Sequence, residues 1–415
     1  MQPAPHNVRT LWLVGILHAF THLYQVALLP LYLPIRDDLR LGSTEQATGL
    51  MTVMMMAYYL PSYPVGMLAD RMSRKALLAW GLFFNGLGFV GLGLSTSYSW
   101  AVASVVIAGL GGSCFHPAAT ALVAGLNPTR TGKALGLIAI GASIGFLSGP
   151  FLSGTMAEAF GSWRVPILVM GGAGVVMSGV FALLAREAAV VVDRAVPSIP
   201  LFPRAAFAWV FAVLAFLFCC RDFAGNSLGT LGSLFLQTAH GMTPRRAGMI
   251  LSCIFIASAV SNPLFGHWSD KRRFPWMMGL VGISAVLFAA FPWLPVAGIP
   301  WAFVLYGALF VASYPIVEAE LMQCVPDAAR GRFFGLFITV GGMGGNLSHW
   351  ITGAWVDQMG RSSHEAGAYR LVFGGLAALM AVSLFGLIPL AWFRRHRGEY
   401  PQPAVAAVPM PSRAD

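Results

Sequence analysis

Twelve apolar runs of about 20 residues each occupy most of this chain of 415 residues. A helix of that length crosses the roughly 30 Å hydrocarbon core of a bilayer. Charged residues make up only 10% of the sequence, whereas a soluble domain has about 25% because its surface faces water. The sequence therefore predicts an all-α membrane protein with twelve transmembrane helices.

The predicted helices fall into two groups of six. They span residues 10–34, 46–69, 75–96, 99–125, 133–158, 164–186, 206–237, 245–267, 275–294, 299–325, 331–356 and 367–393. A charged, proline-containing connection separates the groups. We therefore expect an N-terminal half (1–186), a cytoplasmic linker (187–205), a C-terminal half (206–397) and a disordered tail (398–415).

The basic residues are divided unevenly between the two sides of the predicted membrane. If the N-terminus is cytoplasmic, 18 Lys and Arg residues lie on that side and 7 on the other. Cytoplasmic loops carry such an excess. We therefore predict that both termini are cytoplasmic and that the protein lies in the cell inner membrane. The same distribution assigns the net charge of +10 to membrane topology and not to nucleic-acid binding.

The two groups of helices repeat each other. A shift of 199 residues aligns Gly132 with Gly331 and Gly145 with Gly344. Membrane transporters are often built from repeated halves. The repeat therefore predicts two pseudo-symmetric six-helix halves.

A charged hinge joins the second and third predicted helices. It reads Gly-Met-Leu-Ala-Asp-Arg-Met-Ser-Arg-Lys from Gly66 to Lys75, and a weaker copy begins at Gly266. With the twelve helices and the central linker, this hinge resembles the major facilitator superfamily over essentially the whole chain, although Ser73 stands where the family has Gly. The resemblance implies a secondary transporter and a conformational gating role for Gly66, Asp70, Arg71, Arg74, Lys75 and Asp270. An ordinary loop that obeys the positive-inside rule is the alternative.

Glycines recur every four residues in the fifth predicted helix, at Gly141, Gly145 and Gly149, and Pro150 follows. This pattern resembles the motif of proton-driven antiporters in the same family, which implies a gating role for Gly145, Gly149 and Pro150. Small residues four apart also allow helices to pack closely. Plain packing is therefore the alternative.

Ionisable and polar side chains inside the apolar runs are candidates for a transport site, because they are costly in a bilayer. The candidates for proton coupling are Asp222, Glu318, His22 and His116. Those for substrate binding are Arg221, His18, Gln25, Asn226, Tyr314 and Asn346. Asp222 is the first choice as proton carrier and Arg221 as the binder of an anionic group, because a carboxylate exchanges protons and a guanidinium does not. A mutually neutralised structural pair is the alternative.

The fourth predicted helix contains the string Phe115-His116-Pro117, and the glycine-rich helix follows. This stretch is similar to bacterial efflux proteins of the fosmidomycin resistance type. Many drug–proton antiporters have an arginine in this helix, and the run from Ala101 to Leu126 has none. Either Arg221 supplies the cation from the other half, or proton coupling differs here.

The sequence contains no H-E-x-x-H, P-loop or C-x-x-C string, which argues against an enzyme and against ATP-driven transport. We expect no cofactor and no metal site. The predicted function is proton-coupled export of a small solute, with an anionic compound as one candidate. Proton-coupled uptake of a small organic anion and a non-transporting sensor are the alternatives. The expected partners are the solute, protons and the lipid bilayer, and the chain is predicted to be a monomer.

Overall fold

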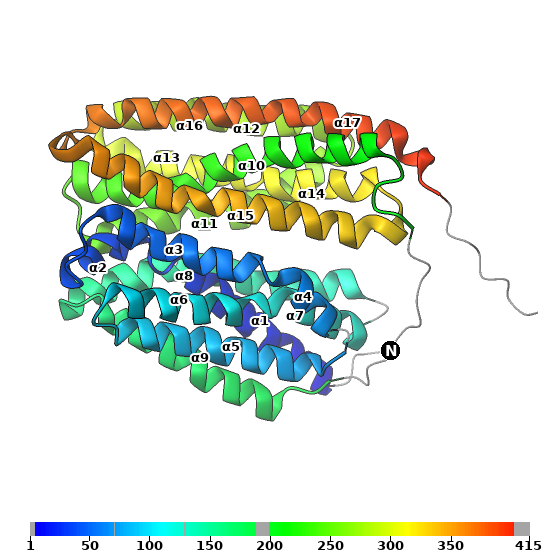
Figure 1. Cartoon of the computed structure of the whole chain (residues 1–415), viewed down its shortest axis with the longest axis horizontal. Coiled ribbons are helices and arrows are strands. Elements are labelled where there is room, and N and C mark those ends of the chain that lie inside the picture. The colour runs from blue at the N-terminus through cyan, green and yellow to red at the C-terminus, as the bar shows by residue number, and fades with distance from the viewer. Residues whose placement is uncertain (1–4, 70, 128–129, 188–198, 402–415) are drawn as a thin grey trace, which may run out of the picture.

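The computed structural model describes residues 5–69, 71–127, 130–187 and 199–401, and most of them are helical (Figure 1). The helices of the N-terminal half are α1 (Pro5–Val26), α2 (Tyr32–Asp38), α3 (Thr44–Tyr59), α4 (Ser62–Ala69), α5 (Arg74–Gly93), α6 (Tyr98–Ser113), α7 (Phe115–Leu126), α8 (Thr131–Phe160) and α9 (Arg164–Leu184). Those of the C-terminal half are α10 (Ala205–Leu234), α11 (Pro244–Ser269), α12 (Arg273–Ala290), α13 (Ile299–Tyr306), α14 (Ser313–Cys324), α15 (Asp327–Met359), α16 (Arg370–Val382) and α17 (Leu387–His396).

Ten of the twelve predicted runs form segments that are long and apolar enough to cross a membrane, within the described residues. The second run forms α3 and α4 instead, because the helix breaks at Leu60 and Pro61 and a proline has no N–H to donate. The eleventh run is α15, a helix of 33 residues that carries the polar residues Asn346 and His349. Both runs lie alongside the other segments (Figure 1), so the predicted all-α fold is confirmed.

The two halves lie side by side and use the same helix pairs (Figure 1). In the N-terminal half α1 packs on α8 and α5 on α9, and in the C-terminal half α10 packs on α15 and α12 on α16. Between the halves, α3 packs on α15 and α8 on α11. The helices α3 and α11 occupy equivalent positions in the two halves, and so do α8 and α15. The two contacts are therefore equivalent to each other, as expected for a duplicated chain with a pseudo-twofold axis.

The molecule has two distinct ends. The helix α1 begins and α17 ends at one end, which we call the terminal end (Figure 1). At the opposite end, which we call the loop end, α3 and α11 begin and α8 and α15 finish. The charged hinge includes the end of α4 and the start of α5 and therefore lies at the terminal end.

The glycines of α8 bring its backbone close to that of α1. A Cβ atom on Gly141 or Gly145 would collide with a main-chain oxygen of α1, from Gly15 or Ala19 respectively. A Cβ atom on Gly149 would lie 2.8 Å from the Leu23 oxygen. In this conformation the glycines that recur every four residues therefore allow α8 to pack closely on α1 inside the N-terminal half.

Replacement of Gly145 by Val is expected to lower the stability of the protein by about 1–3 kcal/mol, because the new side chain forces α1 and α8 apart. The matched control is Gly136→Val on the same helix, where an added Cβ meets no neighbour within 4 Å. The apparent melting temperature of each variant in detergent measures the effect. Equal melting temperatures for the two variants would contradict this interpretation.

Candidate functional site

Arg221 and Asp222 form a buried ion pair in the middle of α10. The Nε and Nη2 atoms of Arg221 lie 2.9 Å and 2.8 Å from Oδ1 of Asp222. The guanidinium also stacks on the ring of Tyr314 in α14, with 4.2 Å between Cζ and the ring centroid. Neighbouring residues on a helix point about 100° apart, but these side chains are long enough to turn toward each other. In this conformation the two charges therefore neutralise each other.

Glu318 lies one turn after Tyr314 on α14 and is half-buried. Its carboxylate is within electrostatic range of both Arg221 and Asp222. Within the described ranges, no hydrogen bond or close ion pair engages this carboxylate. Since one positive and two negative side chains meet here, the group formed by Arg221, Asp222 and Glu318 carries a net charge of −1 when both acids are ionised.

Tyr59 and the predicted residue Asn226 lie around this charged group. The polar ring of Tyr59 on α3 is within electrostatic range of Asp222 and Glu318, and it brings the N-terminal half to the site. On α15, a Cβ atom on Gly345 would lie 3.0 Å from Nδ2 of Asn226, and one on Gly341 would lie 2.9 Å from Oδ2 of Asp222. Asp222 and Asn226 therefore face the glycines of α15.

Glu320 has surroundings quite unlike those of Glu318. Its buried carboxylate lies 2.9 Å from Nη1 of Arg394 and 3.4 Å from Nη1 of Arg273. The exposed Asp270 of the second hinge is a further partner of Arg273, at 3.4 Å. This cluster links α12, α14 and α17 inside the C-terminal half. Asp270 and Glu320 therefore stabilise one half in this conformation.

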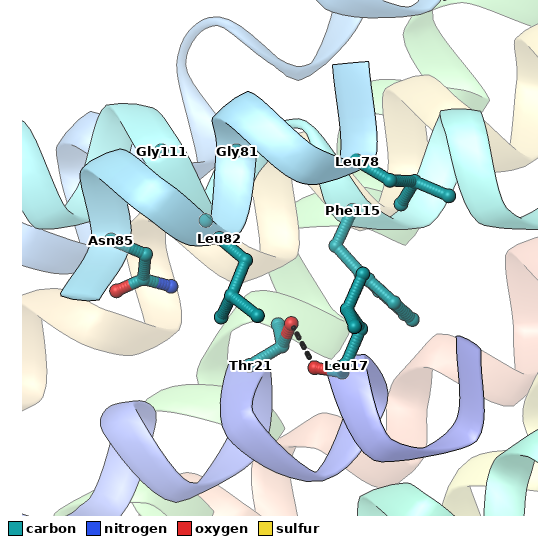
Figure 2. Close-up of a pocket in the computed structure, with 9 residues that line it drawn as sticks. Leu17, Thr21, Leu78, Gly81, Leu82, Asn85, Gly111 and Phe115 are labelled. Carbon is teal, nitrogen blue, oxygen red and sulfur yellow. Dashed lines mark hydrogen bonds between the residues drawn. The ribbon is translucent and has the colours of Figure 1, made fainter. Parts of the chain in front are cut away.

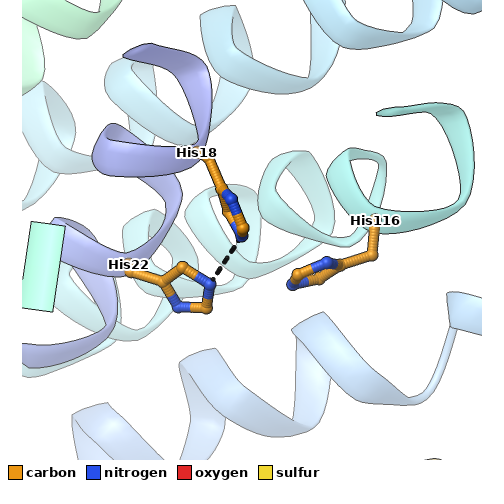
Figure 3. A group of neighbouring side chains, drawn as sticks. All are labelled: His18, His22 and His116. Atoms are coloured by element: carbon orange, nitrogen blue, oxygen red, sulfur yellow. Dashed lines mark hydrogen bonds between the residues drawn. The ribbon is translucent and has the colours of Figure 1, made fainter. Parts of the chain in front are cut away.

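Three predicted histidines meet in the N-terminal half, two on α1 and one on α7 (Figure 3). The Nε2 atoms of His18 and His22 are 3.0 Å apart. The ring centroid of His116 lies 5.4 Å from that of His18 and 5.6 Å from that of His22. Gln25 contacts His22, with 2.7 Å between Oε1 and Nδ1. We call His18, His22 and His116 the histidine cluster.

At the loop end, a carboxylate of one half binds the first turn of a helix of the other half. The backbone N–H groups of Thr44 and Glu45 donate to Oδ1 and Oδ2 of Asp357, at 2.9 Å and 2.7 Å. The first N–H groups of a helix lack partners within the helix, and its dipole favours a negative charge there. The indole of Trp350 donates in turn to Oε1 of Glu45. We call these four residues the interhalf clasp.

Further polar contacts join the halves beside the clasp. The hydroxyl of Thr52 donates to the carbonyl oxygen of Asn346 at 2.9 Å. His349 contacts Thr230 of α10 at 2.6 Å, and the hydroxyl of Tyr32 lies 3.2 Å from Thr230. The side chain of Asn346 is occupied as well, by the Gly342 carbonyl and by His349. Asn346 therefore lies in an interface between helices here, rather than open to a solute.

At the terminal end Glu187, the first residue of the predicted linker, binds the hinge residues at the start of α5. The backbone N–H groups of Arg74 and Lys75 donate to the carboxylate of Glu187, at 2.6 Å and 3.4 Å. Ser73 donates to the same carboxylate and also caps α5, because its oxygen accepts from the N–H of Ala76. Asp70 lies outside the described residues. Arg71 is exposed, and a gating role for the hinge stays a prediction.

The inner helices of the two halves are in close contact at the loop end. Cβ atoms placed on four glycines near the terminal end would meet nothing within 4 Å, namely Gly66, Gly132, Gly331 and Gly335. Cβ atoms on Gly154 and Gly248, near the loop end, would collide with carbonyl oxygens of the opposite half, from Pro244 and Pro150. The halves are therefore closed together at the loop end.

Three acidic residues of these contacts, Glu45, Glu187 and Asp357, are absent from the sequence predictions. Glu187 stands at the start of the linker, where an acid looks like ordinary loop polarity. Asp357 comes directly after the eleventh predicted helix, and a shift of 199 residues places Glu158 opposite it and Gly161 opposite Gly360. Aligning the two halves over this stretch finds the acid, although it does not show that α3 is its partner.

A small cavity lies beside the N-terminal helices α1, α5 and α6 (Figure 2). Its volume is about 10 Å³, and Thr21 and Asn85 are among its polar lining residues. That volume holds about one water molecule. The cavity is therefore too small for a solute, and none of the candidate residues lines it.

Comparison with known proteins gives agreement over nearly the whole chain. The sequence profile of the Major Facilitator Superfamily matches residues 11–220 and 214–411. The multi-drug resistance efflux pump PmrA of Streptococcus pneumoniae is 26% identical over 92% of this chain and 95% of its own length. The fosmidomycin resistance protein of Escherichia coli is 22% identical over 80% of this chain and 83% of its own length. An inward-facing, unoccupied structure of a bacterial homolog of the human lysosomal transporter Spinster superposes with a TM-score of 0.75, at 18% identity over 97% of this chain and all of that one.

Proposed function

The chain belongs to the major facilitator superfamily, and from this premise we propose that it exports a small cationic solute in exchange for protons. Transporters of this kind work by alternating access to a site between their two halves. The observation that carries the proposal is the net negative charge of the group formed by Arg221, Asp222 and Glu318, inside helices that span the membrane.

Glu318 is the group that we assign to proton exchange. An unpaired carboxylate is costly inside a membrane protein, so it is stabilised either by a proton or by a positively charged solute. Since each removes the need for the other, the two ligands compete, and competition couples their movements in opposite directions. Asp222 fits this role less well in the present conformation because Arg221 already neutralises it.

The paired state of Arg221 changes the solute that we expect. An anionic compound requires a free guanidinium, but Nε and Nη2 are both engaged with Asp222. The relatives support export, because PmrA is described as a multi-drug efflux pump and the Escherichia coli relative as a resistance protein. We therefore favour a cationic solute over the anionic one that the sequence suggested.

The orientation in the membrane completes the proposal. The excess of Lys and Arg predicts that the terminal end is cytoplasmic. The halves are closed at the loop end, so the conformation described here is the one that accepts solute from the cytoplasm. The interhalf clasp then closes the outer side of the transporter.

One observation favours the alternative of proton-coupled uptake of an organic anion. The buried Nη1 atom of Arg221 has no hydrogen-bond partner among the residues that the structure describes. An unsatisfied buried donor is costly, and an anionic group would satisfy it. Protonation of Asp222 would then free the guanidinium for the anion, so that proton and anion move together.

Purified protein in sealed vesicles with an imposed pH gradient separates these possibilities. Ethidium is a suitable solute because its permanent charge prevents passive trapping on the acidic side. We expect protein-dependent accumulation of ethidium on the acidic side and its loss when a proton ionophore collapses the gradient. Protein-dependent accumulation of an organic anion toward the alkaline side, beyond that in protein-free vesicles, would support the alternative. A protein that moves no member of a panel of cations, organic acids and phosphonates would support a sensor.

A further inference from the structure

We propose that the histidine cluster binds a divalent transition-metal ion, such as Zn²⁺, Co²⁺ or Ni²⁺, which favour imidazole ligands. One nitrogen from each of His18, His22 and His116 would serve as a ligand, and these atoms all lie within 4.8 Å of one another. The proposal does not depend on the direction of transport or on its solute.

The hydrogen bonds of the two α1 histidines fix where their lone pairs point. Nδ1 of His18 lies 2.9 Å from the Ile138 carbonyl oxygen, which can only accept, so this nitrogen carries a hydrogen. Nδ1 of His22 donates in the same way to Oε1 of Gln25 at 2.7 Å. In their neutral forms both rings therefore present an unprotonated Nε2 atom.

These two Nε2 atoms face each other at 3.0 Å (Figure 3). Two lone pairs at that separation repel each other unless a positive charge lies between or beside them. Ligands at about 2.0–2.1 Å from a tetrahedral zinc ion are separated from each other by roughly 3.3 Å. A metal ion therefore fits this pair with only a small movement of the side chains.

The surroundings of the cluster are those of a metal site. Metal-binding histidines nearly always donate their second ring N–H to a carbonyl or carboxylate, and the Ile138 carbonyl and the Gln25 amide fill that role. Phe115 stacks on His18 with centroids 4.7 Å apart, and Phe146 lies 4.2 Å from His22. These contacts hold two of the three rings in place before an ion arrives.

An ion can reach the site from one side. His18 is buried, His22 is half-buried and His116 is exposed. His18 and His22 are one helical turn apart on α1, whereas His116 comes from α7, so a bound ion would tie these two helices together. Three protein ligands leave a fourth position, which water or a small anion fills.

Titration of the purified, tag-free protein with Co²⁺ tests the proposal, because four-coordinate Co²⁺ has intense visible absorption. We expect one Co²⁺ per chain, displaced by Zn²⁺. His22→Asn and His116→Gln are expected to weaken binding by about 100-fold or more. Gln25→Leu, which removes a supporting hydrogen bond, is expected to weaken it by about 10- to 100-fold. Gln25→Glu keeps an acceptor for His22 and is expected to retain binding.

The matched control is His267→Gln, which changes an exposed histidine outside the cluster and is expected to bind Co²⁺ as the unchanged protein does. Size-exclusion profiles and melting temperatures in the absence of metal identify any variant that fails to fold. The proposal is overturned if the unchanged protein binds none of Co²⁺, Ni²⁺ and Zn²⁺. It is overturned equally if folded His22→Asn and His116→Gln proteins bind Co²⁺ with unchanged affinity.

Discussion

Replacement of Glu318 by Gln is expected to abolish accumulation of ethidium driven by a pH gradient. Glutamine has the shape of a protonated glutamic acid but cannot release a proton, so the exchange of proton for solute loses its carrier. The charged group changes from a net −1 to neutral, and the affinity for ethidium at alkaline pH is expected to fall by about tenfold or more, which is roughly 1.4 kcal/mol.

The pH dependence of binding gives the sharper test of Glu318. In the unchanged protein a proton and the cation compete, so the affinity for ethidium falls as the pH is lowered, by up to about tenfold per pH unit when one proton is displaced. In Glu318→Gln this dependence is expected to disappear. Equilibrium binding to detergent-solubilised protein at several pH values measures it. Persistence of the full dependence in the variant would remove Glu318 from the proposed exchange.

Glu320 provides the control for this experiment because it lies on the same helix, two residues away. Its carboxylate binds Arg273 and Arg394 inside the C-terminal half and is almost completely buried. Removing one partner of a buried ion pair leaves uncompensated charge. Glu320→Gln is therefore expected to lower the melting temperature while the surviving folded protein keeps pH-dependent binding of ethidium.

Replacement of Asp357 by Ala is expected to shift the protein from the conformation closed at the loop end toward one that is open there. The variant loses two short hydrogen bonds from backbone N–H groups of α3 to a carboxylate. Each hydrogen bond to a charged group contributes about 1.5–3 kcal/mol. A combined loss of about 3 kcal/mol changes the ratio of the two conformations roughly a hundredfold.

Spin labels at Thr96 and Ser362 can follow this change, because both are exposed and lie on loop-end connections of opposite halves. The native cysteines are replaced first. Pulsed electron resonance is expected to report one short distance in the parent protein and a population of longer distances in Asp357→Ala. Glu158→Ala, at the equivalent place of the other half, is the control and is expected to keep the short distance. Identical distance distributions for parent and Asp357→Ala would show that the clasp does not hold the halves together.

The fold could be predicted from the sequence because length and apolarity of a helix are local properties. The predicted runs became helical segments even where the helix was interrupted, as at Leu60 and Pro61. The internal repeat also predicted that the two halves would resemble each other, and equivalent helices do pair in the same way in both halves. The closure at one end could not be predicted, because both conformations of a transporter use the same helices and differ only in which faces of the halves meet.

The candidate site was predicted less completely. Ionisable residues in apolar runs included all three members of the histidine cluster, yet His116 is 94 residues from His22, and only the packing of α7 on α1 brings them together. The pairing of Arg221 with Asp222 depends on side-chain rotation, which the helical angle between their Cα atoms does not fix. Glu187 and Asp357 were missed because their partners are backbone N–H groups, which every residue has.

The glycine contacts between α8 and α11 have a mechanical consequence. Gly154 and Gly248 place bare backbone against the carbonyl oxygens of Pro244 and Pro150 in the opposite half. Interlocking side chains would have to withdraw and re-enter each time the halves moved, whereas these two glycines have no side chain to disengage. Farther along the same interface, the rings of Phe146 and Phe255 stack with centroids 4.8 Å apart. In the equivalent contact of α3 with α15, the side chains of Asp357 and Trp350 form hydrogen bonds to the opposite half. The α8–α11 interface thus consists of backbone and ring contacts, whereas hydrogen bonds hold the α3–α15 interface. We therefore expect the α3–α15 side to set the free energy needed to separate the halves at the loop end.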